Sequence, residues 1–177
     1  MGLRYTHKWK LPRVELAGLA SYATQSDRAG NPIDYRDDYY AGDLTATLNG
    51  WSVGGGVDVL QGDGVKGFTA PIGTLHKFQG WADKFLTTPA NGIEDLYATG
   101  GVTLKGVGSL DTLSMVAAYH DYEAEQISAD YGEEWNLSIA AKIKRVNLML
   151  KYADYRQGIP AVGRSTEKVW MQFEFIW

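Results

Sequence analysis

The 177-residue sequence predicts an all-β protein: a transmembrane, antiparallel, up-and-down β-barrel of about 8–10 strands, formed by residues 1–177 as one domain. Three observations lead to this prediction. Apolar and polar residues alternate in long runs, and short and long connections between the runs alternate along the chain. The chain also ends on an alternating aromatic segment. Alternation with a period of two is typical of strands whose two faces meet different surroundings.

The composition agrees with a β protein. Hydrophobic residues make up 45% of the chain and charged residues 21%, which does not fit a disordered protein. The 21 glycines and the 12% of aromatic residues favour strands joined by tight turns. There is no cysteine, so no disulfide is predicted, and the net charge of -4 argues against nucleic acid as a partner.

Nine alternating runs are predicted as strands. In 135–143, Trp135 and Ile139 share one face, whereas Ser138 and Lys142 share the other. Most runs reach the roughly 9–11 residues that a tilted strand needs to cross a bilayer, and soluble strands average roughly 5–6 residues. The runs lie near 3–11, 13–26, 39–49, 51–61, 94–106, 110–124, 132–144, 146–157 and 166–177.

The connections between these runs alternate strictly in length. Bacterial outer-membrane barrels have this asymmetry, with tight turns on the periplasmic side and long loops outside. The short connections lie at 12–13, 49–50, 107–109 and 145, and the longer, polar ones at 27–38, 62–93, 125–131 and 158–165.

The last segment resembles the C-terminal recognition strand of outer-membrane proteins, which the barrel-assembly machinery reads. Phe173, Phe175 and Trp177 share one face and form the predicted assembly signal. Most such proteins end in Phe, so Trp177 departs from the usual pattern. Aromatic residues also gather near the ends of the other runs, where they predict girdles at the membrane boundaries.

The number of runs leaves two alternatives at the N-terminus, because bacterial barrels normally have an even number of strands. Either the strands from residue 13 onward form a closed eight-stranded barrel with 1–11 as an extra segment, or this is the C-terminal portion of a larger barrel. The regular alternation of 3–11 favours the larger barrel. Met1 leads straight into this run without a signal peptide, so either a targeting segment has been cut away or the N-terminus of the natural protein is absent.

A group of motifs resembles the C-terminal region of the alginate export family of outer-membrane proteins. These motifs are HKFQGWADKFL at 76–86 with Pro89, Asn91-Gly92 and DLY at 95–97, HDY at 120–122, ADYG at 129–132 with Glu134-Trp135, and KYADY at 151–155. The resemblance covers nearly the whole chain. It implies a channel for an anionic polysaccharide, a polyuronate, through the bacterial outer membrane. Family members are longer and carry a signal peptide.

If the apolar face of the strands meets lipid, the opposite face lines the lumen. A charge on the lipid side costs roughly 2–4 kcal/mol at the midplane, so the charged residues are expected inside. A lysine-containing wall attracts anions, whereas in a narrow barrel the same side chains would fill the interior. The predicted pore-lining residues are Arg4, Lys8, Lys10, Glu15, Asp43, Asp58, Lys105, Lys142, Lys144, Lys151 and Glu174.

The long connection 62–93 contains a helix-like stretch from Lys77 to Leu86. This connection either folds into the mouth and narrows the pore or lies across the rim as a surface loop. In the first case, Lys77, Trp81, Asp83 and Lys84 form the constriction.

Catalysis and metal binding have little support. Ser114, His120 and Asp121 follow one another along a single strand, and nothing marks an activated serine. The acidic residues at 121–130 are expected to be a solvated loop rather than a calcium site. We therefore expect no enzyme, cofactor or metal.

The sequence thus predicts an outer-membrane, porin-like channel for polar or anionic solutes. One alternative is a closed eight-stranded barrel with a structural or surface-binding role, and another is a soluble ligand-binding barrel.

Overall fold

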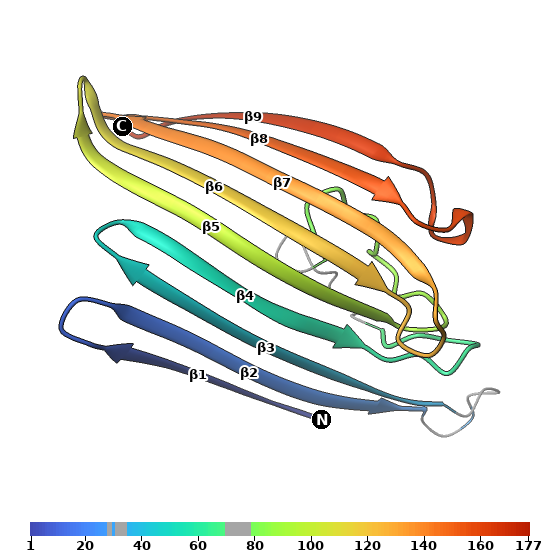
Figure 1. The fold of residues 1–177 in the computed structure, drawn as a ribbon. Helices are drawn as coiled ribbons and strands as arrows, with labels where there is room; N and C mark the ends of the chain where they lie inside the picture. The colour runs from blue at the N-terminus through green and yellow to red at the C-terminus, as the bar shows by residue number, and fades with distance from the viewer. Residues whose placement is uncertain (28–29, 31–34, 70–78) are drawn as a thin grey trace.

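The computed structural model describes residues 1–27, 30, 35–69 and 79–177. It forms one sheet of nine strands in the order β1 to β9, and every neighbouring pair is antiparallel (Figure 1). No helix in these residues is long and apolar enough to cross a membrane. The strands are β1 (Gly2–Lys10), β2 (Glu15–Ser26), β3 (Arg36–Leu48), β4 (Trp51–Leu60), β5 (Ile93–Val107), β6 (Leu110–Glu123), β7 (Asp130–Ile143), β8 (Val146–Gln157) and β9 (Thr166–Phe175).

The nine strands confirm the nine predicted runs, with ends that differ by a few residues. The alternation of connections is confirmed as well: the tight turns gather at one end of the sheet and the long connections at the other (Figure 1). Residues 2–10 are a regular member of the sheet, because β1 pairs with β2 from Gly2 to Lys10.

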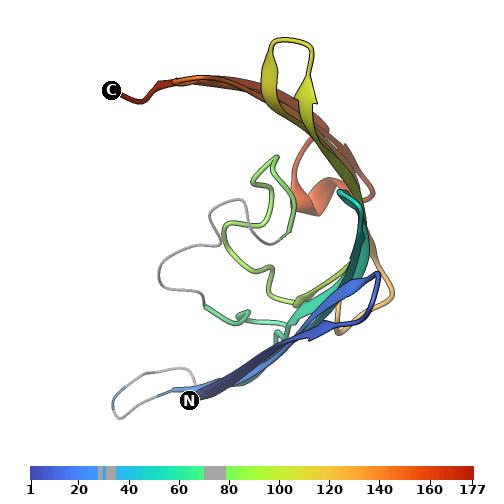
Figure 2. The same ribbon diagram turned by 90° about the vertical axis from the view of Figure 1, so that its left-hand side faces the viewer.

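The sheet is open, so the prediction of a barrel closed within this chain is wrong. Figure 2 shows the sheet as an arc with the two termini at its opposite edges. Within the described residues, β1 pairs only with β2, and β9 pairs only with β8. Eight reversals separate β1 from β9, so the two edge strands run in the same direction and would meet in parallel. The eight-stranded alternative would require β2 to pair with β9, but β1 already occupies that edge of β2.

The short turns follow from local backbone chemistry. At the turn between β3 and β4, Asn49 and Gly50 have φ values of 49° and 85°. Two successive positive φ values match the right-handed twist of a two-residue hairpin, and Asn-Gly is the sequence that adopts them most readily.

One irregularity changes which face a side chain occupies. The register between β6 and β7 shifts at Tyr122 and Glu123, and Gly132 has a φ of 111°. Tyr131 precedes this glycine and is 3% exposed, within the cluster that contains Tyr122 and Tyr155. The bulge therefore brings Tyr131 into the core.

The connection from β4 to β5 begins with a tight turn. The Asp63 carboxylate accepts hydrogen bonds from the backbone N–H groups of Lys66 (2.6 Å) and Val65 (2.8 Å). These bonds stabilise the ionised form, so they lower the pKa of Asp63. An isolated bridge between Gly62 and Gly67 closes the turn.

The second described part of this connection, 79–92, lies on the concave side of the sheet (Figure 2). The predicted helix at 77–86 is wrong over 79–86, which forms bends and turns. Gln79, Gly80 and Asp83 have φ values of 54°, 74° and 56°, which a right-handed helix does not allow. The apolar side chains of this stretch are buried against the sheet instead: Ala82 is 1% and Phe85 4% exposed.

Candidate functional site

The concave face of the sheet carries almost all of the predicted pore-lining residues. The strand register places ten of them on the same face as the inward segment 79–86. Lys144 is the exception, because it lies in the turn between β7 and β8 with a φ of 54°. The ten are Arg4, Lys8, Lys10, Glu15, Asp43, Asp58, Lys105, Lys142, Lys151 and Glu174.

Basic and acidic groups differ in exposure along this face. Lys10, Lys105 and Lys142 are exposed near the tight turns, and Lys8 pairs with Glu15 at 3.6 Å. Four acidic side chains nearer the long connections are at most 1% exposed: Asp37, Asp58, Asp95 and Glu134. Solvent on the concave side therefore meets mainly the basic groups.

The buried acidic groups form a polar layer beneath the inward segment. Asp95 lies opposite Asp58 on the neighbouring strand, and both of its carboxylate oxygens lie 3.0 Å from Nδ1 of His120. Asp43 accepts a hydrogen bond from the Tyr97 hydroxyl at 2.9 Å. Neither carboxylate oxygen of Asp58 has a hydrogen-bond partner among the residues that the structure describes.

The structure does not bring together Ser114, His120 and Asp121, the residues of the weakly supported catalytic site. His120 is paired with Asp95, whereas Asp121 points to the opposite face of β6. The Ser114 hydroxyl is 3.1 Å from the Thr103 hydroxyl. Within the described residues, no three His, Cys, Asp or Glu side chains are grouped as a metal site would require.

The inward segment 79–86 is attached to the wall made by β6–β9. Glu134 Oε1 accepts the backbone N–H groups of Trp81 (2.6 Å) and Ala82 (2.8 Å). The Phe85 ring packs against Tyr122, at 4.8 Å between ring centroids, and also against Tyr131 and Tyr155. The segment thus crosses the concave side and meets strands remote from its own ends.

Three of the four predicted constriction residues take part in this attachment. Lys151 Nζ lies 4.7 Å from the ring centroid of Trp81. Asp83 forms an ion pair with Lys168 at 3.1 Å, and Lys84 Nζ donates to the carbonyl oxygen of Arg164 at 2.9 Å. The fourth, Lys77, lies outside the described residues.

The convex face is apolar over most of its area. Val53, Leu150 and Phe173 are 66%, 47% and 67% exposed there. No outward position of β1–β9 holds Asp, Glu, Lys or Arg except near the strand ends. Those end positions are Asp111 beside a tight turn and, beside the long connections, Arg36, Asp38, Glu94, Asp121, Glu123, Asp130, Glu133, Asp154, Arg156 and Glu167.

Aromatic residues border this apolar band. Towards the long connections, Tyr22 lies opposite Tyr40, and Tyr119 lies opposite Trp135. The hydroxyl of Tyr22 donates to Asp38 at 3.1 Å and that of Tyr119 to Glu133 at 2.7 Å. The rings therefore stay in the band while the hydroxyls bond to the charged residues beyond it.

The aromatic residues near the tight turns complete the border of the band. Trp9, Trp51, Phe173 and Phe175 point outward there. The predicted assembly signal includes Phe173 and Phe175 on this face, whereas Trp177 follows the end of β9 and is 95% exposed. His7 also lies within the band, between the rings of Tyr5 and Trp9.

Three aromatic residues predicted near strand ends do not belong to these rows. Tyr122 and Tyr155 are 0% exposed in the core beneath the inward segment, and Tyr39 packs against the same core. Their concave positions follow from their place in the alternation, because Tyr155 has the same parity as Lys151 in β8.

Glu134 and Lys168 have roles that no pattern in the sequence indicates. Both occupy the concave face, at the same parity as Lys142 in β7 and Glu174 in β9. Alternation therefore placed them on the polar face, but their contacts with 79–86 depend on the path of a long connection.

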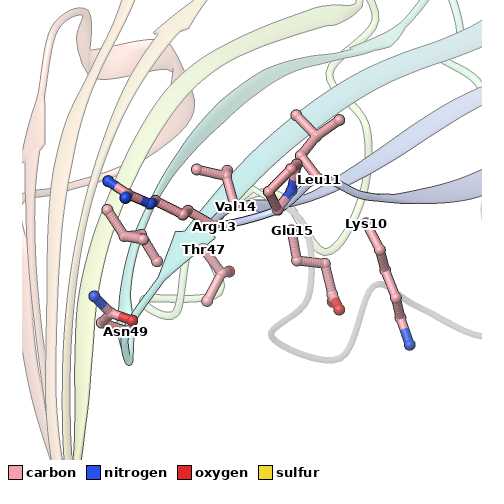
Figure 3. Close-up of a pocket in the computed structure, with 9 residues that line it drawn as sticks. Lys10, Leu11, Arg13, Val14, Glu15, Thr47 and Asn49 are labelled. Carbon is pink, nitrogen blue, oxygen red and sulfur yellow. The ribbon is translucent and has the colours of Figure 1, made fainter.

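An open hollow of about 670 Å³ lies at the tight-turn end of β1, β2 and β3 (Figure 3). Lys10 and Glu15 point to one side of it, and Arg13 points away from them. It is lined by residues 10–15 and 47–49, most of which are exposed, so it adds charged groups to the rim of the sheet.

No protein-family model, curated protein or solved structure matches this chain. The resemblance to the alginate export family therefore stays a prediction.

Proposed function

We propose that this sheet is part of the wall of a bacterial outer-membrane channel that passes polar or anionic solutes. In this proposal the convex face meets lipid and the concave face meets the aqueous lumen. An anionic polysaccharide such as a polyuronate is the proposed solute.

The observation that carries the proposal is the difference between the two faces of the sheet, one apolar and one polar. A wide apolar band covers the convex face, aromatic rows border it, and charged residues lie beyond the rows. Lipid-facing surfaces of outer-membrane barrels have this order of residues. A soluble barrel has the opposite arrangement, with apolar side chains inside, which argues against a soluble ligand-binding barrel.

The exposed basic residues support a preference for anions. Arg4, Lys10, Lys105 and Lys142 are exposed on the concave face, while Asp58, Asp95 and Glu134 are buried. Positive charge along a passage with low-dielectric walls raises the local concentration of anions.

The inward segment supports a channel of restricted width. Trp81, Asp83 and Lys84 lie over the concave wall and are held there by side chains of β7 and β9. A loop in this position narrows the passage and presents lysine and tryptophan to a passing solute.

Membrane fractionation and current recordings test the proposal. The protein is expected to sediment with the outer membrane, to require detergent for extraction, and to give stable single-channel current steps after purification from that membrane. The reversal potential in a salt gradient should show anion preference. Recovery in buffer without detergent would refute the membrane location, and the absence of current steps would favour a structural barrel.

A further inference from the structure

We propose that Glu134 is the positioning residue that fixes segment 79–86 as a permanent constriction rather than a mobile lid. This inference rests on the proposed channel for its functional meaning. The attachment itself is a separate claim that can be tested without a channel.

Glu134 offers one carboxylate oxygen to two successive backbone donors. Oε1 accepts the N–H groups of Trp81 at 2.6 Å and of Ala82 at 2.8 Å, and the side chain is fully buried. A carboxyl oxygen has two lone pairs, so Oε1 can accept both bonds. Asn136 Oδ1 lies 3.3 Å from the same Trp81 nitrogen, so the next concave position of β7 supports the contact.

Gly80 allows the chain to approach Glu134 this closely. Its φ is 74°, and a Cβ at this position would collide with the hydroxyl of Tyr122 and the carboxylate of Glu134. A glycine here lets the backbone lie directly on the wall. The backbone at Gly80 therefore packs directly against the Glu134 side chain, with no room for another group between them.

Two further attachments follow in the same segment. Phe85 is 4% exposed among three tyrosine rings of β6, β7 and β8. Lys84 Nζ lies 3.1 Å from the Thr166 hydroxyl, and Asp83 pairs with Lys168. These contacts reach β9, so the segment is held at several points across the wall.

The position of Trp81 depends most directly on Glu134. The Trp81 backbone is bound to Glu134, and its ring lies beneath the Lys151 ammonium group. Removing the carboxyl group leaves the buried N–H of Ala82 without an acceptor and leaves the Trp81 N–H only its longer contact with Asn136 Oδ1, which is costly. The segment would then detach near Trp81, and the geometry of Trp81 and Lys151 in the passage would no longer be fixed.

Trypsin cleavage after Lys84 measures this detachment. In the folded protein Lys84 is engaged with β9, so cleavage requires local opening of the segment. We expect Glu134→Ala to raise the cleavage rate by roughly tenfold or more, because tenfold corresponds to about 1.4 kcal/mol and a buried N–H group left without an acceptor costs about 1–3 kcal/mol. Glu134→Gln keeps an acceptor oxygen and should give a smaller increase.

Glu133→Ala is the matched control. It removes the same charge from the adjacent position of β7, but Glu133 points to the other face and bonds to Tyr119. If Glu134→Ala does not fold, Glu134→Gln against Glu133→Gln gives the same comparison. Cleavage after Lys84 at the same rate in the Glu134 and Glu133 variants would overturn the inference.

Current recordings connect this attachment to the channel. Glu134→Ala should show open-channel fluctuations that the unsubstituted protein and Glu133→Ala lack. Equal currents in all three would overturn the constriction role. If no protein gives current but cleavage still depends on Glu134, the channel proposal fails while the attachment stands.

Discussion

At the scale of single residues, the face of the sheet decides what a substitution costs. Ile139 and Ala140 are neighbours in β7, but Ile139 is 43% exposed on the convex face and Ala140 lies on the concave face. Ala140 is one of the residues that line a concave hollow of about 330 Å³, together with Lys142 and Glu174. An added arginine therefore has room and polar neighbours at 140, but would lie among apolar groups at 139.

We expect Ile139→Arg to destabilise the membrane-embedded protein by about 2–4 kcal/mol. Ala140→Arg should cost much less, because its guanidinium group remains in the polar lumen. Urea unfolding in lipid vesicles, followed by the shift in electrophoretic mobility between folded and unfolded protein, measures both. Equal costs for the two arginines would contradict the lipid-facing assignment of the convex side.

Residue faces could be predicted wherever a period of two continues without interruption. Lys142 and Lys151 follow this rule, because their strands are regular on both sides of them. The rule did not apply to Lys144 in its turn or to Tyr131 beside the bulge. It also could not show that Tyr155 would be covered by a distant segment, since burial there comes from Phe85.

At the scale of elements, the tight turns contribute a separate part of the stability. Gly50 and Gly108 both have positive φ, at 85° and 59°. A Cβ at Gly50 would collide with the carbonyl oxygen of Thr103, whereas one at Gly108 would meet nothing within 4 Å. Substituting Gly108 therefore introduces backbone strain alone, whereas substituting Gly50 introduces backbone strain and a steric collision.

Gly108→Ala is expected to cost about 1–2 kcal/mol, the penalty for a side chain in the left-handed region. Gly50→Ala should cost more, because the hairpin of β3 and β4 must also move away from β5. Urea unfolding of both variants in the same detergent gives the comparison. A Gly50→Ala cost no greater than that of Gly108→Ala would contradict the predicted collision.

The strands and turns could be predicted because their signals are local. Alternation marks the strands, and Asn-Gly marks a hairpin without reference to the rest of the chain. The inward segment was different: the spacing of Trp81, Phe85 and Leu86 suggested a helix, but positive φ values at Gln79 and Asp83 break it. Its path is set by Glu134 and the tyrosine core, which are contacts between distant parts of the sequence.

At the scale of the whole molecule, the open edges define what can complete the wall. In the part of the chain that the structure describes, β1 and β9 each have one side without a neighbouring strand. Each backbone N–H or C=O group left unpaired in hydrocarbon costs several kcal/mol, about the same as burying an unsatisfied amide. A sheet embedded in a membrane must therefore have both of its edges paired. Because β1 and β9 run in the same direction, an antiparallel unit that joins them must contain an odd number of strands.

This parity excludes a ring made only of copies of this sheet in one membrane orientation, because β9 of one copy would meet β1 of the next in parallel. We therefore predict that the conducting assembly contains further strands besides this sheet, with an odd number of them between β9 of each copy and the next β1. Mass measurement of the assembly in detergent gives its composition.

Cysteines at Thr6 and Leu19, which lie opposite each other on β1 and β2, provide a positive control for strand cross-linking. Cysteines placed along β9 should form no cross-link to β1 of another copy. A conducting ring composed solely of this sheet, with β9 cross-linked to β1 of its neighbour, would contradict the prediction and require a parallel seam in the wall.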